Sequence, residues 1–163
     1  MKNIVFDLGG VLFARDKSKC TPELLEFFSF LRTPRMPLFW EEYDRGTSTL
    51  EEVTATISGM TGRPVETVDL QEPVKPTERL VGDLKAAGYR LYVLSNMSRE
   101  FIDFLRRFPV YGLFDGEVVS CEEHTVKPEP RIYEILLERY GLTPSETLFI
   151  DDREMNIEAA AAL

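Results

Sequence analysis

Four short apolar runs recur along this sequence, and polar residues able to carry chemistry stand at or near their ends. These polar residues are Asp7, Ser95-Asn96, Lys127 and Asp151-Asp152. Segments with the apolar spacing of helices separate the runs. Strands alternating with helices in this way imply right-handed crossovers and a parallel sheet with helices on both faces. Because ligands bind outside the carboxyl ends of such a sheet, we expect the polar residues to form one site.

The spacing predicts an α/β protein with four strands in its core. Gly88 and Gly141 follow two of the helical segments directly, at the place where a left-handed residue ends a helix. The predicted strands are 2–6, 89–94, 114–119 and 147–150. The predicted helices are 77–87, 98–108, 128–140 and a last one that begins after Asp152.

Residues 15–75 differ from the rest, because their apolar residues have helical spacing and show no strand alternation. A helix is predicted to begin at Thr21-Pro22-Glu23 and to carry Leu24, Leu25, Phe27, Phe28 and Leu31. The expected interruptions are Pro34, Pro37, Gly59, Gly62 and Pro64. We therefore expect residues 15–75 to be a helical insert in a core made of residues 1–14 and 76–163.

The composition excludes several classes of protein. A chain of 163 residues can bury a core without disulfides, and a formal charge of -9 argues against binding to a nucleic-acid backbone. Cys20 and Cys121 lack close-spaced Cys or His partners, which fits free thiols in a reducing compartment. There is neither a signal-peptide pattern nor an apolar stretch of the ~20 residues that span a bilayer, so we expect a cytoplasmic protein.

Asp7 can act as a nucleophile, a metal ligand or both. A free Asp carboxylate has a pKa of about 3.9, so it is ionised at neutral pH and can attack an electrophile without a general base. Asp151 and Asp152 would converge on it, and three carboxylates repel one another unless a cation lies between them. Oxygen ligands of this kind suit Mg²⁺, which shares its remaining positions with water and a substrate phosphate.

The other polar residues suit a phosphoryl group. Lys127 can neutralise its charge, while the Ser95 hydroxyl and the amides of Asn96 and of the turn containing Gly10 can hold its oxygens. Each of these residues alone has a plain structural explanation, as a turn former, a solvated lysine or a helix cap. Their occurrence together at successive strand ends favours a functional site.

Four sequence motifs carry a resemblance to a known family. They are residues 4–11 (IVFDLGGV), 93–96 (VLSN), 127–133 (KPEPRIY) and 149–156 (FIDDREMN). In this order they are similar to the motifs of the haloacid dehalogenase-like hydrolase superfamily. The resemblance covers nearly the whole chain. It implies a Rossmann-like α/β sandwich with strand order 4-1-2-3 and a small all-helical cap inserted after the first motif.

The resemblance also implies a role for each site residue. Asp7 would be the nucleophile and a Mg²⁺ ligand, and the Gly9 carbonyl would bind the same ion. Asp152 would bind it directly and Asp151 directly or through water. The residues left with supporting roles are Ser95 and Lys127, which would bind phosphate, and Asn156, which would brace the acidic pair.

Two departures from the family pattern bear on activity. Phosphatases of the family usually carry a second Asp two residues after the nucleophile, where it protonates the leaving oxygen, but this chain has Gly9. A positioned acid is worth roughly 10²- to 10⁴-fold in rate, so turnover is expected to favour good leaving groups. Asp16 and His124 are the candidates for a replacement donor. The second departure is the missing strand after the fourth motif, which suggests a truncation or an early chain end.

These features predict a Mg²⁺-dependent phosphatase that acts on a small phosphorylated metabolite, such as a sugar phosphate, through an aspartyl-phosphate. A 2-haloacid dehalogenase needs no acid, so Gly9 permits that activity, but the acidic pair argues for phosphate. A phosphosugar mutase is disfavoured because it depends on the missing acid. A phosphate- and metal-binding module without turnover is the non-enzyme alternative. Trp40, Tyr43 and Arg45 of the insert either face the substrate or form core.

Overall fold

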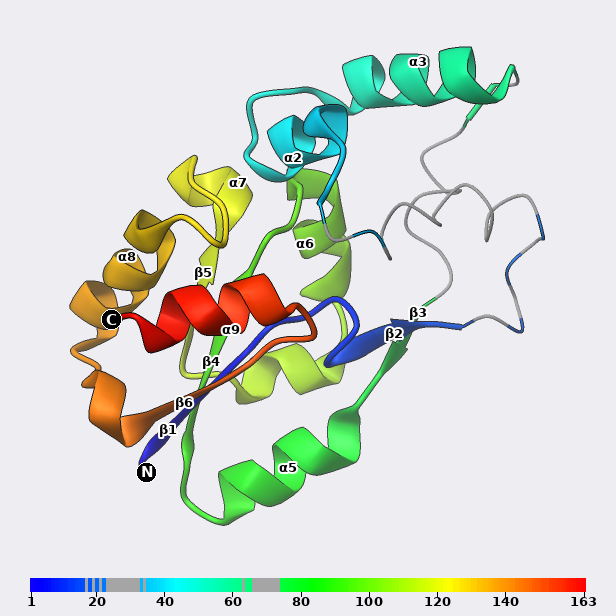
Figure 1. Ribbon diagram of the computed structural model, residues 1–163. Coiled ribbons are helices and arrows are strands. Elements are labelled where there is room, and N and C mark those ends of the chain that lie inside the picture. Colours follow the sequence, from blue (N-terminus) through cyan, green and yellow to red (C-terminus); the bar gives the residue numbers. More distant parts are fainter. Residues whose placement is uncertain are drawn as a thin grey trace.

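The computed structural model describes residues 1–16, 18, 20, 22, 33, 35–62, 64–65 and 74–163. Its central element is a four-stranded sheet made of β1 (Asn3–Phe6), β4 (Arg90–Ser95), β5 (Gly116–Val119) and β6 (Thr147–Ile150). Every neighbouring pair is parallel, and the order is β5-β4-β1-β6. If the four sheet strands are numbered 1 to 4 along the chain, the order from β6 to β5 is 4-1-2-3, as expected. Figure 1 shows the sheet at the centre of the molecule.

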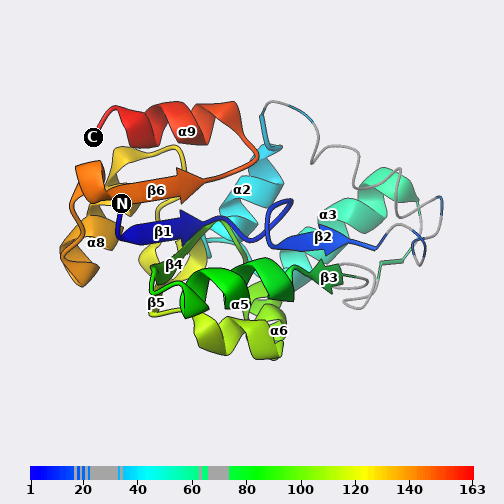
Figure 2. The same ribbon diagram turned by 90° about the horizontal axis from the view of Figure 1, so that it is seen from below.

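Two layers of helices sandwich the sheet. Ile4 and Phe6 of β1 lie in one apolar cluster with Val81 and Ile102, which belong to α5 (Glu78–Ala86) and α6 (Arg99–Leu105). Alternate strand residues point to the other face, where Val5 packs with residues of α8 (Pro130–Tyr140) and α9 (Glu154–Ala161). Figure 2 shows α9 on one side of the sheet and α5 and α6 on the other. The α/β class and the parallel sheet are therefore confirmed.

Helix ends follow the local sequence signals. Gly88, with φ 87°, lies just beyond α5, and Gly141, with φ 60°, caps α8, so both glycines adopt the expected left-handed backbone. The predicted helix 98–108 ends earlier, at Leu105, and a short 3₁₀ helix, η2 (Pro109–Leu113), follows it. The remaining short elements are α7 (Ser120–Glu123) and η3 (Pro144–Glu146).

A short antiparallel pair of strands joins the two ends of the insert. Strand β2 (Phe13–Arg15) pairs with β3 (Val74–Pro76), and the Thr77 amide donates to the Leu12 carbonyl at 2.8 Å. The chain therefore leaves and re-enters the core at one place. This pair was not predicted, because three residues are too few to show strand alternation and their partners lie about sixty positions apart along the chain.

The described part of the insert contains α2 (Leu38–Asp44) and α3 (Leu50–Thr61). Pro37 precedes α2 as expected, and a capping box between Thr49 and Glu52 begins α3. Gly59 lies inside α3, so the predicted interruption there is wrong, and the helix ends instead at Gly62 with φ 69°. The helix predicted to begin at Thr21-Pro22-Glu23 lies outside the described residues. Among the described residues, none of the helices is long and apolar enough to cross a membrane.

Candidate active site

Asp7 and Asp151 stand side by side at the carboxyl ends of β1 and β6. The register pairs Phe6 with Ile150, and the Asp7 amide donates to the Ile150 carbonyl at 2.9 Å. The chain runs from β1 outward to β4 and β5 and then returns to the other side of β1 as β6. The space between β1 and β6 is thus the topological switch point, where sheets of this kind bind ligands.

The Asp7 carboxylate is buried and has two donors of its own. The Ser95 hydroxyl donates to Asp7 Oδ1 at 2.7 Å, and Lys127 Nζ lies 2.9 Å from the same oxygen. Burial raises the pKa of Asp7; the Lys127 charge lowers it, while the Asp151 charge raises it further. The structure thus brings together residues that are 88 and 120 positions apart in the sequence.

Lys127 links the two acidic strand ends. Its side chain is 1% exposed, and Nζ lies 2.5 Å from Asp151 Oδ2 and donates to the Leu94 carbonyl at 2.9 Å. The ammonium also lies over the Phe149 ring, with Nζ 5.5 Å from its centroid. Since a buried ammonium needs negative partners, this arrangement excludes the solvated lysine that a sequence alone would allow.

Asn96 holds the Lys127 backbone in place. Its Oδ1 accepts from the Lys127 amide at 2.7 Å, and its Nδ2 donates to the Lys127 carbonyl at 2.9 Å. The Asn96 side chain is therefore occupied in positioning the lysine. The role predicted for Asn96, in which its amide holds a phosphate oxygen, stays a prediction.

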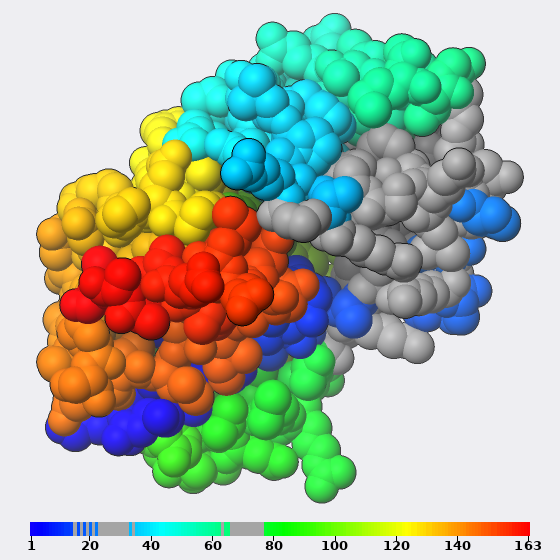
Figure 3. Space-filling view, viewed as in Figure 1, coloured from blue at the N-terminus to red at the C-terminus, as the bar shows by residue number. Residues whose placement is uncertain are grey.

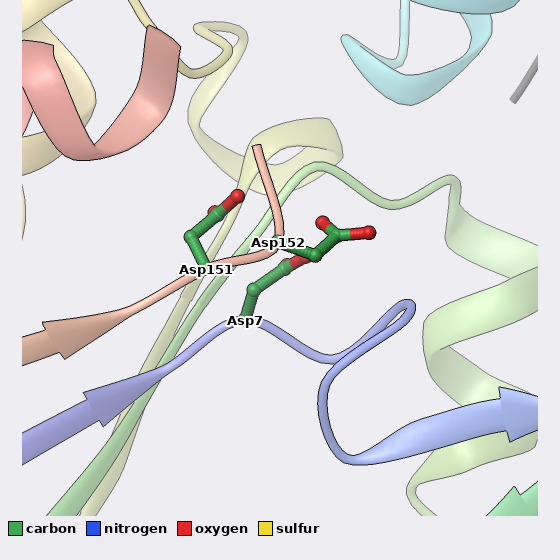
Figure 4. A group of neighbouring side chains, drawn as sticks. All are labelled: Asp7, Asp151 and Asp152. Atoms are coloured by element: carbon green, nitrogen blue, oxygen red, sulfur yellow. The ribbon is translucent and has the colours of Figure 1, made fainter. Parts of the chain in front are cut away.

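Asp151 and Asp152 occupy different environments although they are adjacent. The Asp151 side chain is fully buried, and Asn156 Nδ2 contacts both of its oxygens, at 2.9 and 3.0 Å. Asp152 is exposed; partial burial of its carboxyl raises its pKa, and the charges of Asp7 and Asp151 raise it further. Figure 4 shows the three Asp side chains leaving the two neighbouring strand ends. The site carries excess negative charge that a cation would relieve.

The turn after Asp7 depends on its second glycine. Gly10 has φ 77°, and a Cβ atom there would lie 2.4 Å from Asp152 Oδ2, so a side chain would meet the carboxylate. Its amide donates to the Phe13 carbonyl at 3.2 Å. The predicted phosphate-binding role of Gly10 stays a prediction. Gly9 differs, because a Cβ there would meet nothing within 4 Å.

Comparison with known proteins agrees with this geometry. The model of the haloacid dehalogenase-like hydrolases matches residues 1–163. The chain belongs to this family. It is 27% identical, over 99% of its own length and 86% of the relative's, to the sesquiterpene phosphatase astK of Aspergillus oryzae. It is also 33% identical to (S)-2-haloacid dehalogenase 1 of Pseudomonas sp., over 50% of its own length and 37% of the relative's.

The family includes a solved structure of similar shape. A variant of a haloacid dehalogenase family enzyme from Bacteroides thetaiotaomicron, crystallised in complex with magnesium and inorganic phosphate, has a TM-score of 0.79 and 27% sequence identity. The match covers 99% of this chain and 90% of that one.

In the present chain, the carboxylate oxygens of the site can bind a divalent cation. One carboxylate oxygen from each of Asp7, Asp151 and Asp152 can be chosen so that all lie within 4.8 Å of one another. Hard oxygen donors around a site of this size suit Mg²⁺. Asp151 is already held by Lys127 and Asn156, whereas Asp152 is exposed and borders the Gly10 turn. The expected roles, with Asp152 as a direct ligand and Asp151 as a direct or water-mediated one, stay predictions.

Trp40 and Tyr43 of the insert are core residues. Both are buried in a cluster with Val53 and Ile57, their rings stack edge to face, and the Tyr43 hydroxyl donates to Glu100 at 2.8 Å. The sequence left open whether Trp40 and Tyr43 face the substrate or form core. Their burial shows that they belong to the core of the insert. Arg45, by contrast, is not part of this cluster, and its guanidinium forms an ion pair with Glu129.

The two expected replacement donors lie in unlike surroundings. Asp16 is buried, and its Oδ1 accepts from the Ser18 hydroxyl at 2.6 Å. His124 is exposed and has a left-handed backbone, and its Nδ1 lies 3.3 Å from the Arg45 carbonyl oxygen.

One acidic residue near the site was missed by sequence reasoning. Asp44, the last residue of α2, is buried, and the charges of Asp7 and Lys127 both act on its carboxyl. A single Asp at the end of a helix has no sequence signal that separates it from a surface residue. Only the tertiary contacts of α2 reveal its place.

Proposed function

We propose that this protein is a Mg²⁺-dependent phosphatase that hydrolyses a small phosphorylated metabolite through an aspartyl-phosphate on Asp7. The observation that carries the proposal is the buried group of Asp7, Ser95 and Lys127 beside two further carboxylates. This group places a nucleophile next to a cation that can neutralise phosphate. Both adjoin the acidic residues that can bind a metal. Relatives named as phosphatases support the same reaction.

Each residue takes a role that its contacts support. Asp7 attacks phosphorus, since a carboxylate needs no general base. Lys127 and Ser95, which contact Asp7 Oδ1, are placed to move onto the phosphoryl oxygens and balance their charge. Asp7, the Gly9 carbonyl, Asp152 and, directly or through water, Asp151 would hold Mg²⁺, which supplies charge stabilisation to the phosphoryl group when bound.

The insert would control access to this site. We propose that residues 15–75 form a cap domain over a core of residues 1–14 and 76–163. The β2–β3 pair supports this division, because it brings both ends of the insert to one place beside the site. Substrate choice would then depend on the insert. A cytoplasmic location, with no nucleic-acid or membrane partner, remains part of the proposal.

A 2-haloacid dehalogenase is the alternative that the similarity to (S)-2-haloacid dehalogenase 1 favours. Asp7 and Lys127 would serve that reaction as well, and Gly9 would cost nothing, because a halide needs no proton. The clustered oxygens of Asp7, Asp151 and Asp152 weigh against it, since displacement of a halide from carbon has no use for a metal. A module that binds phosphate and metal without turnover is the third possibility.

One set of assays separates these possibilities. Phosphate release from an aryl phosphate and from a panel of sugar phosphates is measured with Mg²⁺ and with a chelator, and chloride release is measured from 2-chloropropionate. We expect phosphate release that requires Mg²⁺ and no chloride release. Chloride release without metal would establish the dehalogenase, and neither product would leave only the binding module.

Matched variants test the nucleophile in the same assay. Asp7→Asn should reduce phosphate release by at least about 10³-fold, because it removes the covalent pathway. The control Asp83→Asn changes an exposed Asp of α5 and should keep wild-type turnover. Near-wild-type turnover by Asp7→Asn would reject the covalent mechanism.

A further inference from the structure

Asp44, the last residue of α2, is held next to the carboxyl ends of the sheet strands. Its backbone carbonyl accepts from the Ser120 hydroxyl, and Ser120 Oγ in turn accepts from the Met97 amide at 2.9 Å. Ser120 directly follows β5, and Met97 follows the Ser95-Asn96 pair at the end of β4. The end of α2 is therefore tied to the carboxyl ends of two sheet strands.

The next two residues fasten the same point. Arg45 donates to both oxygens of Glu129, at 2.7 and 3.0 Å, and Glu129 lies two residues after Lys127. Gly46 has φ 74°, and a Cβ there would lie 2.7 Å from the Cys121 carbonyl oxygen, so only glycine allows the close approach. We call Asp44, Arg45 and Gly46 the latch. In Figure 1, α2 lies above the strand ends beside α7, and Figure 3 shows the surfaces of these segments in contact.

Asp44 is buried, and its carboxyl lies near enough to the site for the charges there to act on it. Asp44 is 6% exposed. The charges of Asp7 and Lys127 act on its carboxyl, and so does the charge of Arg153, which follows Asp152 in the sequence. A buried carboxyl whose pKa is perturbed by burial and by nearby charges marks a candidate functional group.

Its ionisation suits a proton donor. Burial raises the pKa of Asp44 to about 8, and the charge of Asp7 adds to this effect. Lys127 and Arg153 lower its pKa and Glu41 raises it. Asp44 also interacts with the titratable side chains of Tyr43 and Cys121. The carboxyl is therefore mostly protonated at neutral pH, as a general acid must be before the reaction.

We propose that Asp44 protonates the leaving oxygen of the substrate and so replaces the acid that Gly9 lacks. The proposal rests on the phosphatase function above. In the first step Asp7 forms a bond to phosphorus, the ester P–O bond breaks, and its electron pair takes the proton of Asp44. In the second step water attacks phosphorus and gives its proton to the Asp44 carboxylate, while the pair of the broken P–O bond returns to Asp7.

The test is the dependence of the first step on the leaving group. Single-turnover release of the alcohol or phenol is measured for a series of phosphate monoesters with Mg²⁺. In the wild type the rate should depend weakly on the leaving group, because a proton is supplied. In Asp44→Asn the dependence should become steep, with alkyl phosphates slowed by about 10²-fold or more and the best aryl phosphates nearly unchanged.

Near-isosteric controls separate the rival donors. Asp16→Asn and His124→Gln should keep the weak dependence of the wild type. An Asp44→Asn variant with the wild-type dependence overturns the proposal, and so does an equal loss for all leaving groups, which would mean a structural role. Retained aryl turnover shows that the variant is folded. Failure of the phosphatase function itself would appear separately, as no turnover of any ester by the wild type.

Discussion

At the scale of single residues, the site is a set of buried charges that contact one another. Lys127 touches both Asp7 and Asp151, and Asn156 satisfies the oxygens of Asp151. The sequence predicted these neighbours because each follows a strand or belongs to a motif. It could not predict Asp44, because the burial of that residue depends on contacts made by Ser120 and Arg45.

The ionisation of Asp44 should be visible in stability. Its pKa is about 8 in the folded state against an ordinary 3.8, so the folded protein holds a proton that the unfolded chain loses. The contribution of protonated Asp44 to the free energy of unfolding is therefore largest below about pH 4, and it is lost as the pH rises to about 8. Asp44→Asn does not titrate, so without metal its free energy of unfolding should rise relative to the wild type across this range. Urea titrations at pH 5 and pH 8.5 measure the free energy of unfolding of both proteins. If the difference between variant and wild type were the same at the two pH values, the raised pKa of Asp44 would be contradicted.

An acid at position 9 should substitute for Asp44. The Gly9 backbone is not left-handed, and a Cβ there would meet nothing within 4 Å, so Gly9→Asp adds a carboxyl without evident strain. In the Asp44→Asn background, Gly9→Asp should recover alkyl phosphate hydrolysis by about tenfold or more, since a positioned acid is worth at least that. No recovery, with the fold intact, would mean that proton donation is not what Asp44→Asn removes.

At the scale of elements, the strands were easier to predict than the insert. Strand β6 has the predicted bounds 147–150, β1 begins one residue later than predicted, and β4 is shifted by one residue at both ends. Their apolar runs are continuous because both faces of the sheet are covered. The β2–β3 pair contains Pro76 and only three residues a side, so its existence depends on tertiary pairing.

The latch should matter more for poor leaving groups than for good ones. Arg45 holds Glu129, whose pKa falls to about 2 chiefly through the hydrogen bond from Arg45. Arg45→Met should loosen α2 and slow alkyl phosphates by about 10- to 100-fold, since displacing a catalytic group by about 1 Å can cost that much. Arg131→Met, which alters an exposed arginine of α8, is the control. Equal slowing of aryl and alkyl esters would contradict a latch that positions the donor.

At the scale of the whole molecule, Mg²⁺ should stabilise the folded state. The unfolded chain does not hold Asp7, Asp151 and Asp152 together, so binding adds to the free energy of unfolding by mass action. Thermal unfolding should shift upward with Mg²⁺ in the wild type and much less in Asp152→Asn. Asp83→Asn should respond as the wild type does. An unchanged response in Asp152→Asn would remove that residue from the metal site.

The central claim is that Asp7 becomes phosphorylated, and trapping tests it most directly. The wild type is mixed with an aryl phosphate and Mg²⁺, quenched in acid during turnover and treated with borohydride, which reduces an acyl phosphate to an alcohol. Peptide mass spectrometry should find the reduced side chain at position 7 and no reduction in Asp7→Asn. Reduction at another carboxylate, or continued turnover by Asp7→Asn, would contradict the account.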